Sequence, residues 1–319
     1  MLKSFTCFRI QEGWQAPDFH ALSDALGRSI FRPCGPTERR TSGWVPPRGV
    51  AHGPLLESVS GQWLMTLMSE TRQLPASAVR AELDLRLDAV EAQIGRRPRG
   101  KAKREMKEQV EHELMPRAFT GKSAVMVWID PRSRMLVLGT PSAKGADLVV
   151  AELLTVFEDR LPLAPLHTAQ SPAGAMATWL ASRQAPAGFS IDLECELRQG
   201  DDTRATVKYT RHTLDTDEVA LHLHHGKLPA YLAMTWADRV SFVLTDDMKI
   251  KRVKFLDVQT AAAPGTARDG EEDHFDANAA LATGELSQLM GDLLDALGGE
   301  QAPGVPADGA LLSAPAERR

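Results

Sequence analysis

Two neighbouring segments in the first third of the chain carry apolar residues at helical spacing. The first predicts a helix that starts near Pro75, and the second predicts a helix that stops before Pro116. Glycine and proline residues at 95–100 separate them, so the pattern predicts an αα-hairpin that projects as a finger over 74–122. The periodic positions are Val79, Leu83, Leu87, Val90 and Ile94 in the first helix and Met106, Val110 and Leu114 in the second.

Short apolar or alternating runs bounded by turn residues predict strands on both sides of this finger. The turn residues 130–133 and 246–249 each lie between two such runs and predict β-hairpins. Residues 32–49 are rich in proline, glycine and charge and predict a loop, and residues 261–272 predict a mobile connection. We expect strands at 4–10, 62–68, 124–129, 135–139, 204–210, 240–244 and 250–256, and helices at 18–26, 149–157, near Trp179 and at 286–297.

These elements predict an α+β fold made of antiparallel sheets with packed helices and the projecting helical finger. The finger interrupts a central α+β domain formed by residues 1–73 and 123–165. A second α+β domain follows over 166–299. Residues 300–319 are rich in glycine, proline and alanine and are expected to be disordered.

Composition restricts the class of protein. The chain has 319 residues, of which 43% are hydrophobic and 25% charged, as in soluble proteins with a real core. No stretch approaches the roughly 18 apolar residues of a membrane span, and the leading residues alternate, so we expect neither membrane insertion nor secretion. The three cysteines, Cys7, Cys34 and Cys195, are far apart, which favours reduced thiols in a cytoplasm over disulfides or a zinc site.

Charge is unevenly distributed along the chain. Residues 269–319 carry eleven acidic residues against two arginines, so residues 1–268 carry +4 although the whole chain carries −5. Residues 95–107, expected as the loop of the finger, hold seven cations against one carboxylate. Such crowding indicates a phosphate backbone as partner, although a solvated loop tip is the alternative. The seven are Arg96, Arg97, Arg99, Lys101, Lys103, Arg104 and Lys107.

Two smaller clusters could also contact nucleic acid. Phe119, beside Arg117 and Lys122, could wedge between base steps or stack on bases, but the sequence alone favours a core residue that locks the finger onto the sheet. A second basic cluster leaves a predicted strand and could line a channel for a polyanion, or it could protect an edge strand. Its candidate DNA-binding residues are Lys208, Arg211 and His212.

Motifs for catalysis are weak. Gly121-Lys122-Ser123 has the end of a phosphate-binding loop, but Pro116 occupies the position of the first glycine. Residues 222–225 hold three histidines without a carboxylate or cysteine to complete a metal site. The adjacent carboxylates at 246–247 lie in a predicted turn. We therefore expect no enzyme, no metal and no cofactor.

Six short motifs follow one another along the chain. They are Phe31–Gly35 with Gly43–Pro47, Leu114–Phe119, Trp128–Asp130, Leu161-Pro162, Lys251–Phe255 and Thr283–Leu286. No motif is specific alone, but in this order, over roughly residues 1–299, they resemble the RdgC family of recombination-associated proteins.

The resemblance implies a bacterial, cytoplasmic and nucleoid-associated protein that forms a ring-shaped homodimer around double-stranded DNA without sequence preference, with single-stranded DNA left open as a partner. It implies restraint of RecA-driven strand exchange. It also implies roles in binding for Phe119 and, at the opposite dimer contact, for Arg211 and His212. At the position of His212, another member of the family has a glutamine, so an imidazole replaces a side-chain amide in this chain.

Two other function classes remain open from the sequence. In a protein-interaction module, the finger would contact a recombinase directly and DNA affinity would be incidental. A nuclease would need converging carboxylates, which the sequence does not indicate.

Overall fold

The computed structural model describes residues 2–200, 205–256 and 271–301. In this part of the chain, helices and antiparallel sheets confirm the α+β class. The connection expected at 261–272 lies outside the described residues up to Gly270, and Glu271 already begins a helix. Of the expected tail, Glu300 pairs with Arg9 and Gln301 donates to the carbonyl of His167, whereas 302–319 lie outside the described residues.

The first sheet contains seven antiparallel strands in the order β2-β4-β5-β6-β1-β7, with β3 paired to β4. Four consecutive residues of β4, from Leu64 to Leu67, are buried, so both faces of the sheet are covered there. The strands are β1 (Thr6–Ile10), β2 (Arg40–Val45), β3 (Glu57–Val59), β4 (Gln62–Gln73), β5 (Phe119–Asp130), β6 (Met135–Leu138) and β7 (Leu163–Pro165).

Helices α1 (Phe19–Gly27) and α4 (Ala143–Val156) pack on one face of this sheet and form a core with Met65 and Leu67. Both helices start at a side-chain cap. Asp18 accepts from two backbone N–H groups of α1, and Ser142 accepts from one of α4.

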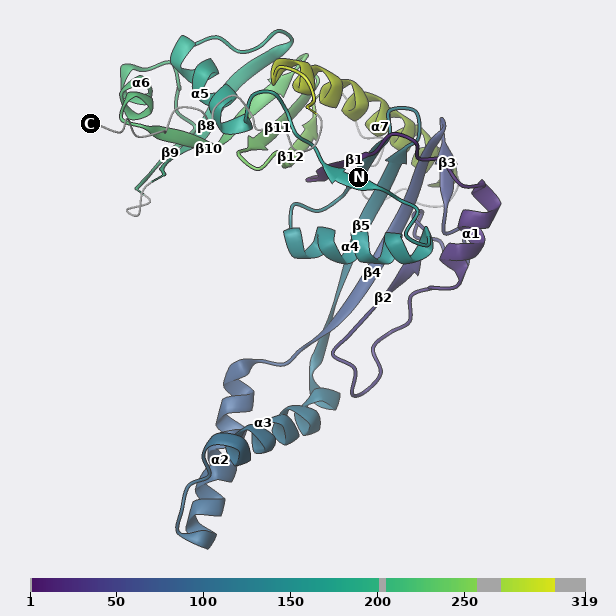
Figure 1. The fold of residues 1–319 in the computed structure, drawn as a ribbon, viewed down its shortest axis with the longest axis vertical. Helices are drawn as coiled ribbons and strands as arrows, with labels where there is room; N and C mark the ends of the chain where they lie inside the picture. Colours follow the sequence, from purple (N-terminus) through teal and green to yellow (C-terminus); the bar gives the residue numbers. More distant parts are fainter. Residues whose placement is uncertain (1, 201–204, 257–270, 302–319) are drawn as a thin grey trace, which may run out of the picture.

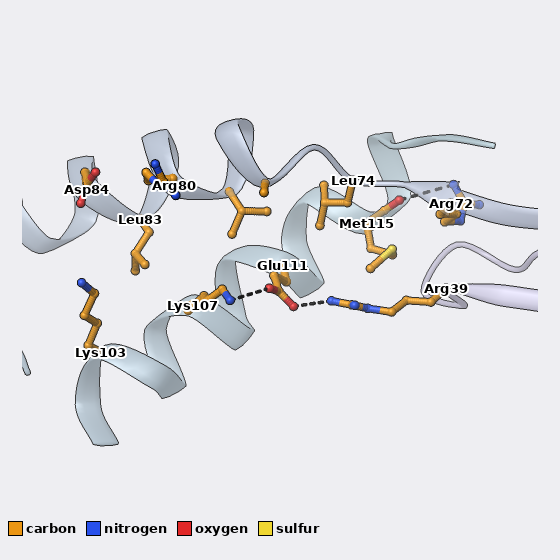
Figure 2. A pocket seen from close by; sticks show the side chains of 12 residues that line it. Arg39, Arg72, Leu74, Arg80, Leu83, Asp84, Lys103, Lys107, Glu111 and Met115 are labelled. Carbon is orange, nitrogen blue, oxygen red and sulfur yellow. Dashed lines mark hydrogen bonds and ion pairs between the residues drawn. The ribbon is translucent and has the colours of Figure 1, made fainter. Parts of the chain in front are cut away.

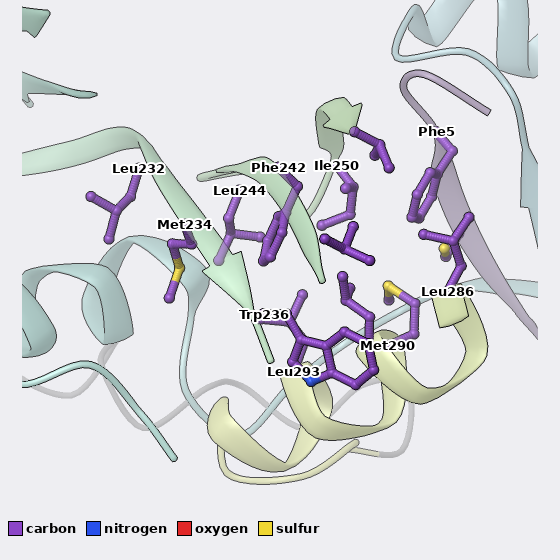
Figure 3. Packing of buried hydrophobic residues seen from close by; sticks show 14 of the residues in the cluster. Phe5, Leu232, Met234, Trp236, Phe242, Leu244, Ile250, Leu286, Met290 and Leu293 are labelled. Atoms are coloured by element: carbon purple, nitrogen blue, oxygen red, sulfur yellow. The ribbon is translucent and has the colours of Figure 1, made fainter. Parts of the chain in front are cut away.

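The second sheet contains five antiparallel strands in the order β12-β11-β10-β8-β9. Helix α7 (Glu271–Ala296) packs its buried Leu286, Met290 and Leu293 beside Trp236 of this sheet and Phe5, which precedes β1 (Figure 3), and the same hydrophobic cluster includes Trp128 of the first sheet. One continuous core therefore joins the two sheets. The remaining elements are β8 (Phe189–Gln199), β9 (Thr206–Thr210), β10 (Lys227–Trp236), β11 (Val240–Thr245), β12 (Ile250–Phe255), α5 (Pro172–Ser182) and α6 (Asp217–His224).

The finger is carried by the long β4–β5 ribbon, which continues past the other strands of its sheet (Figure 1). Helix α2 (Ala76–Ile94) ends at Gly95 in the left-handed conformation, and α3 (Gly100–Leu114) returns through the 3-10 turn η1 (Met115–Arg117). The molecule forms an arc, with the finger at one end and the second sheet at the other.

Several expectations about the elements were wrong. The loop expected at 32–49 contains β2, because its residues 40–45 pair with β4. The basic segment 95–107 is a loop only up to Arg99, since the lysine, alanine and glutamate residues that follow favour helix and form α3. Residues 119–122, expected in the finger, begin β5. Strands β8 and β10 and helix α6 were not predicted, although β8 carries an alternating pattern.

Candidate nucleic-acid interface

The seven cations of segment 95–107 are divided between the finger loop and the first turns of α3. Arg97 turns back onto α2, where its guanidinium pairs with Asp84, Asp88 and Glu91. The hydrogen bond with Asp88 raises the pKa of Arg97. Three carboxylates therefore surround this charge, and Arg97 stabilises the hairpin instead of facing an external anion.

Two lysines of α3 also have intrahelical partners. Lys101 lies 3.7 Å from a Glu105 carboxylate oxygen, and Lys107 lies 3.5 Å from one of Glu111, both at i,i+4 spacing. Because these pairs are largely exposed, they leave the lysines able to exchange partners.

The other four cations of the segment form no ion pair within the described residues. They surround the start of α3, which has no side-chain cap and no acidic residue in its first turn. The positive end of the helix dipole adds to their repulsion, so an external anion would stabilise this end of the finger. The four unpaired finger cations are Arg96, Arg99, Lys103 and Arg104.

Phe119 lies at the finger root, at the first position of β5 and opposite Gln73. Its side chain is 86% exposed, so the expectation that it locks the finger onto the sheet was wrong. Lys122 lies opposite Glu70 with its ammonium 5.6 Å from the ring centroid of Phe31, and Arg117 is exposed in η1. The structure therefore leaves the ring of Phe119 available for an external contact.

Replacing Phe119 with alanine should leave the free energy of unfolding within about 0.5 kcal/mol of the unchanged protein, because the ring packs on little. Duplex affinity should fall if the ring contacts bases or a second copy. Denaturant unfolding and duplex titration measure the two effects. Phe242→Ala, which removes a buried ring, should cost about 3–5 kcal/mol and is the contrast. A loss above about 2 kcal/mol for Phe119→Ala would restore a core role.

The second sheet gathers another group of cations on the face turned away from its core. Lys208 of β9 lies 5.8 Å from the ring centroid of Tyr231 on β10. Arg252 of β12 pairs with Glu194 of β8 at 2.9 Å, and this lowers the pKa of Glu194. Two adjoining shallow cavities of about 230 Å³ each connect these residues, and the second also brings in Arg211.

We call these cations the sheet-face cluster: Lys208, Arg211, Lys251, Arg252 and Lys254. Sequence reasoning missed its members on β12. Lys251 lines the first cavity and Lys254 the second, where they meet residues about fifty positions earlier in the chain. The basic run 251–254 was the available signal. The imidazole of His212 makes a local contact instead, because its Nδ1 lies 2.7 Å from the carbonyl oxygen of the neighbouring Thr213.

Within the described ranges, no three His, Cys, Asp or Glu side chains converge as metal ligands, and no helix is long and apolar enough to cross a membrane. The three cysteines are free, and burial raises the pKa of Cys195 to about 12. His222, one of the three neighbouring histidines, lies with its Nδ1 3.3 Å from Nζ of Lys227.

Comparisons with known proteins agree over nearly the full length. The family model described as "RdgC: Putative exonuclease, RdgC" matches residues 1–300. The recombination-associated protein RdgC of Cupriavidus pinatubonensis is 44% identical over 299 residues, which cover 94% of this chain and 98% of the relative. Those of Dechloromonas aromatica and Bordetella pertussis are 41% and 39% identical, over 93% and 94% of this chain and 97% and 98% of the relatives. The chain therefore belongs to the RdgC family of recombination-associated proteins.

Proposed function

We propose that the protein binds double-stranded DNA without sequence preference, as one half of a ring-shaped homodimer that encircles the duplex. The observation that carries the proposal is the pair of cation groups near opposite ends of the arc: the unpaired finger cations and the sheet-face cluster. Lysine and arginine contacts to phosphates position a protein but carry no sequence information.

The arc shape of the single chain supports a ring, because a second copy could close it. Phe119 at the finger root and Arg211 beside β9 are both exposed, and the finger and β9 belong to opposite halves of the arc. Contacts at both ends would join two arcs into a closed path around DNA. One contact has to open when the ring loads onto closed circular DNA, so we expect the two contacts to differ in strength.

A protein that occupies duplex DNA in this way would restrain RecA-mediated strand exchange by excluding the recombinase from its substrate. Membership of a recombination-associated family supports this role. It also supports a cytoplasmic, nucleoid-associated location. We propose no enzymatic step, no metal and no cofactor.

A salt titration of binding to two linear duplexes of unrelated sequence, with a covalently closed circle alongside, tests the proposal. We expect equal affinities for the two duplexes, a steep dependence on salt, and complexes that slide off linear DNA but stay on the circle. A dimer in solution should accompany these results.

Three outcomes would contradict the proposal. Weak binding that does not respond to salt would favour direct contact with a recombinase. Strong preference for one duplex would indicate readout of bases. Degradation of DNA ends that requires a divalent metal would favour the nuclease activity named in the family description.

A further inference from the structure

Among the described residues, the finger shares no apolar core with the rest of the molecule. Its buried residues belong to neither of the two large hydrophobic clusters, which join the sheets to α1, α4, α5 and α7. Its orientation therefore depends on the β4–β5 ribbon and on polar contacts at the root. The buried finger residues are Val79, Leu83, Leu87, Val110 and Met115.

Two arginines from the body make these root contacts. The guanidinium of Arg72 donates to the carbonyl oxygens of Met115 and Ala118 at 3.4 and 3.1 Å, and to that of Gly35 at 3.1 Å. Arg39 pairs with Glu111 of α3, which also accepts from Lys107 (Figure 2). The root of the finger is thus held to the body by charged side chains.

A crevice of about 420 Å³ lies among α2, α3 and this root. Five cations and two carboxylates line it, and both carboxylates are already paired: Asp84 with Arg97, and Glu111 with Arg39 and Lys107. The other three cations form no ion pair within 4 Å among the described residues, and the hydrogen bonds of Arg72 go to carbonyl oxygens. The crevice therefore has an excess of positive charge. These three cations are Arg72, Arg80 and Lys103.

We propose that this crevice binds a phosphate chain, either a nucleic-acid backbone or a free polyphosphate, and that the bound chain holds the finger to the body. Phosphate oxygens accept several charge-assisted hydrogen bonds at once, which suits lysine and arginine converging from separate elements. Arg80 and Lys103 belong to the finger, whereas Arg39 and Arg72 belong to the body, so a chain that contacts both groups links them. This inference deepens the proposed function, because it assigns a particular phosphate site and a conformational consequence.

Calorimetric titration with sodium tripolyphosphate tests the site. The double variant Arg80→Ala/Lys103→Ala should bind it at least about tenfold more weakly than the unchanged protein. The matched control Arg28→Ala/Lys144→Ala removes the same charge from exposed positions on the body outside the crevice and should change the affinity less than about threefold. All four side chains are exposed, so both variants should fold. Equal losses in the two variants would overturn the site.

Spin labels at Ala92→Cys on α2 and Ala151→Cys on α4, in a Cys34→Ser background, test the link to finger position. Both sites are exposed, and Cys7 and Cys195 are buried. Tripolyphosphate should narrow the distribution of distances between the labels. A distribution that stays the same at saturation would overturn the proposed holding of the finger.

Competition with duplex DNA distinguishes the two phosphate sources. Displacement of tripolyphosphate by duplex, with both affinities lowered in the single variant Arg80→Ala, assigns the crevice to the DNA backbone. Simultaneous binding assigns it to a free polyphosphate. Intact duplex binding with no crevice-dependent tripolyphosphate binding would refute this site alone, whereas the reverse result would refute the proposed function alone.

Discussion

Replacing the four unpaired finger cations with glutamine should weaken duplex binding on all sequences alike and flatten its dependence on salt. Each lysine or arginine that neutralises a phosphate contributes about 0.9 to the slope of log affinity against log salt concentration. If all four contact phosphates, the slope should fall by about 3.6 per protomer. Glutamine keeps a favourable helix propensity in α3, so the finger should stay folded. The variant combines Arg96→Gln, Arg99→Gln, Lys103→Gln and Arg104→Gln.

The matched control replaces two arginines that each lie against more than one carboxylate, Arg86 and Arg97. Arg86→Gln/Arg97→Gln should change the slope much less, since Arg86 pairs with Glu82 and Glu113 and Arg97 lies against the acidic side chains of α2. Slopes are measured over the same salt range on two unrelated duplexes. A fourfold variant with an unchanged slope would show that the finger cations do not contact phosphates.

Leu293→Ala should lower the free energy of unfolding by about 2–5 kcal/mol. Leu293 is fully buried on α7 and belongs to the cluster that contains residues of both sheets (Figure 3). Its loss leaves a cavity that close-packed neighbours fill only in part, and this adds to the lost burial of the side chain.

Denaturant unfolding measures this loss, and Leu281→Ala on the same helix is the control. The side chain of Leu281 is 39% exposed, so its truncation should cost less than about 1 kcal/mol. Because one core joins the two sheets, we expect one cooperative transition for the body. Two separated transitions, or equal losses in the two variants, would contradict the role of α7.

The elements that the sequence predicted well are those with strong local periodicity. The helix of Val79 and Leu83, the hairpin around Asp130 and the end of the last helix near Gly298 all lie close to their expected positions. Spacing and turn chemistry act within a few residues, so they are visible in the chain itself. Strand β10 was missed because its mixed apolar run contains Pro229 and resembles neither template.

For the candidate site, the sequence showed where the cations are but not which of them lack carboxylate partners. The density of cations at 95–107 is visible in the sequence, whereas the pairing of Arg97 with three carboxylates of α2 arises only because the loop after Gly95 turns back onto that helix. Phe119 shows the same limit. An apolar aromatic residue is expected in a core, yet Phe119 at the outer end of the β4–β5 ribbon is exposed to solvent.

The class of fold, the position of the finger, its basic end and the family resemblance could all be inferred from the amino-acid sequence, because these depend on neighbouring residues and on the order of motifs. The folded structure was needed to show which cations stay unpaired, which aromatic ring is exposed, and that Lys208 and Arg211 lie beside Lys251 and Arg252. Burial and the grouping of cations on the second sheet depend on segments that are distant along the chain. Only the folded packing brings those segments together, and so only the structure decides them.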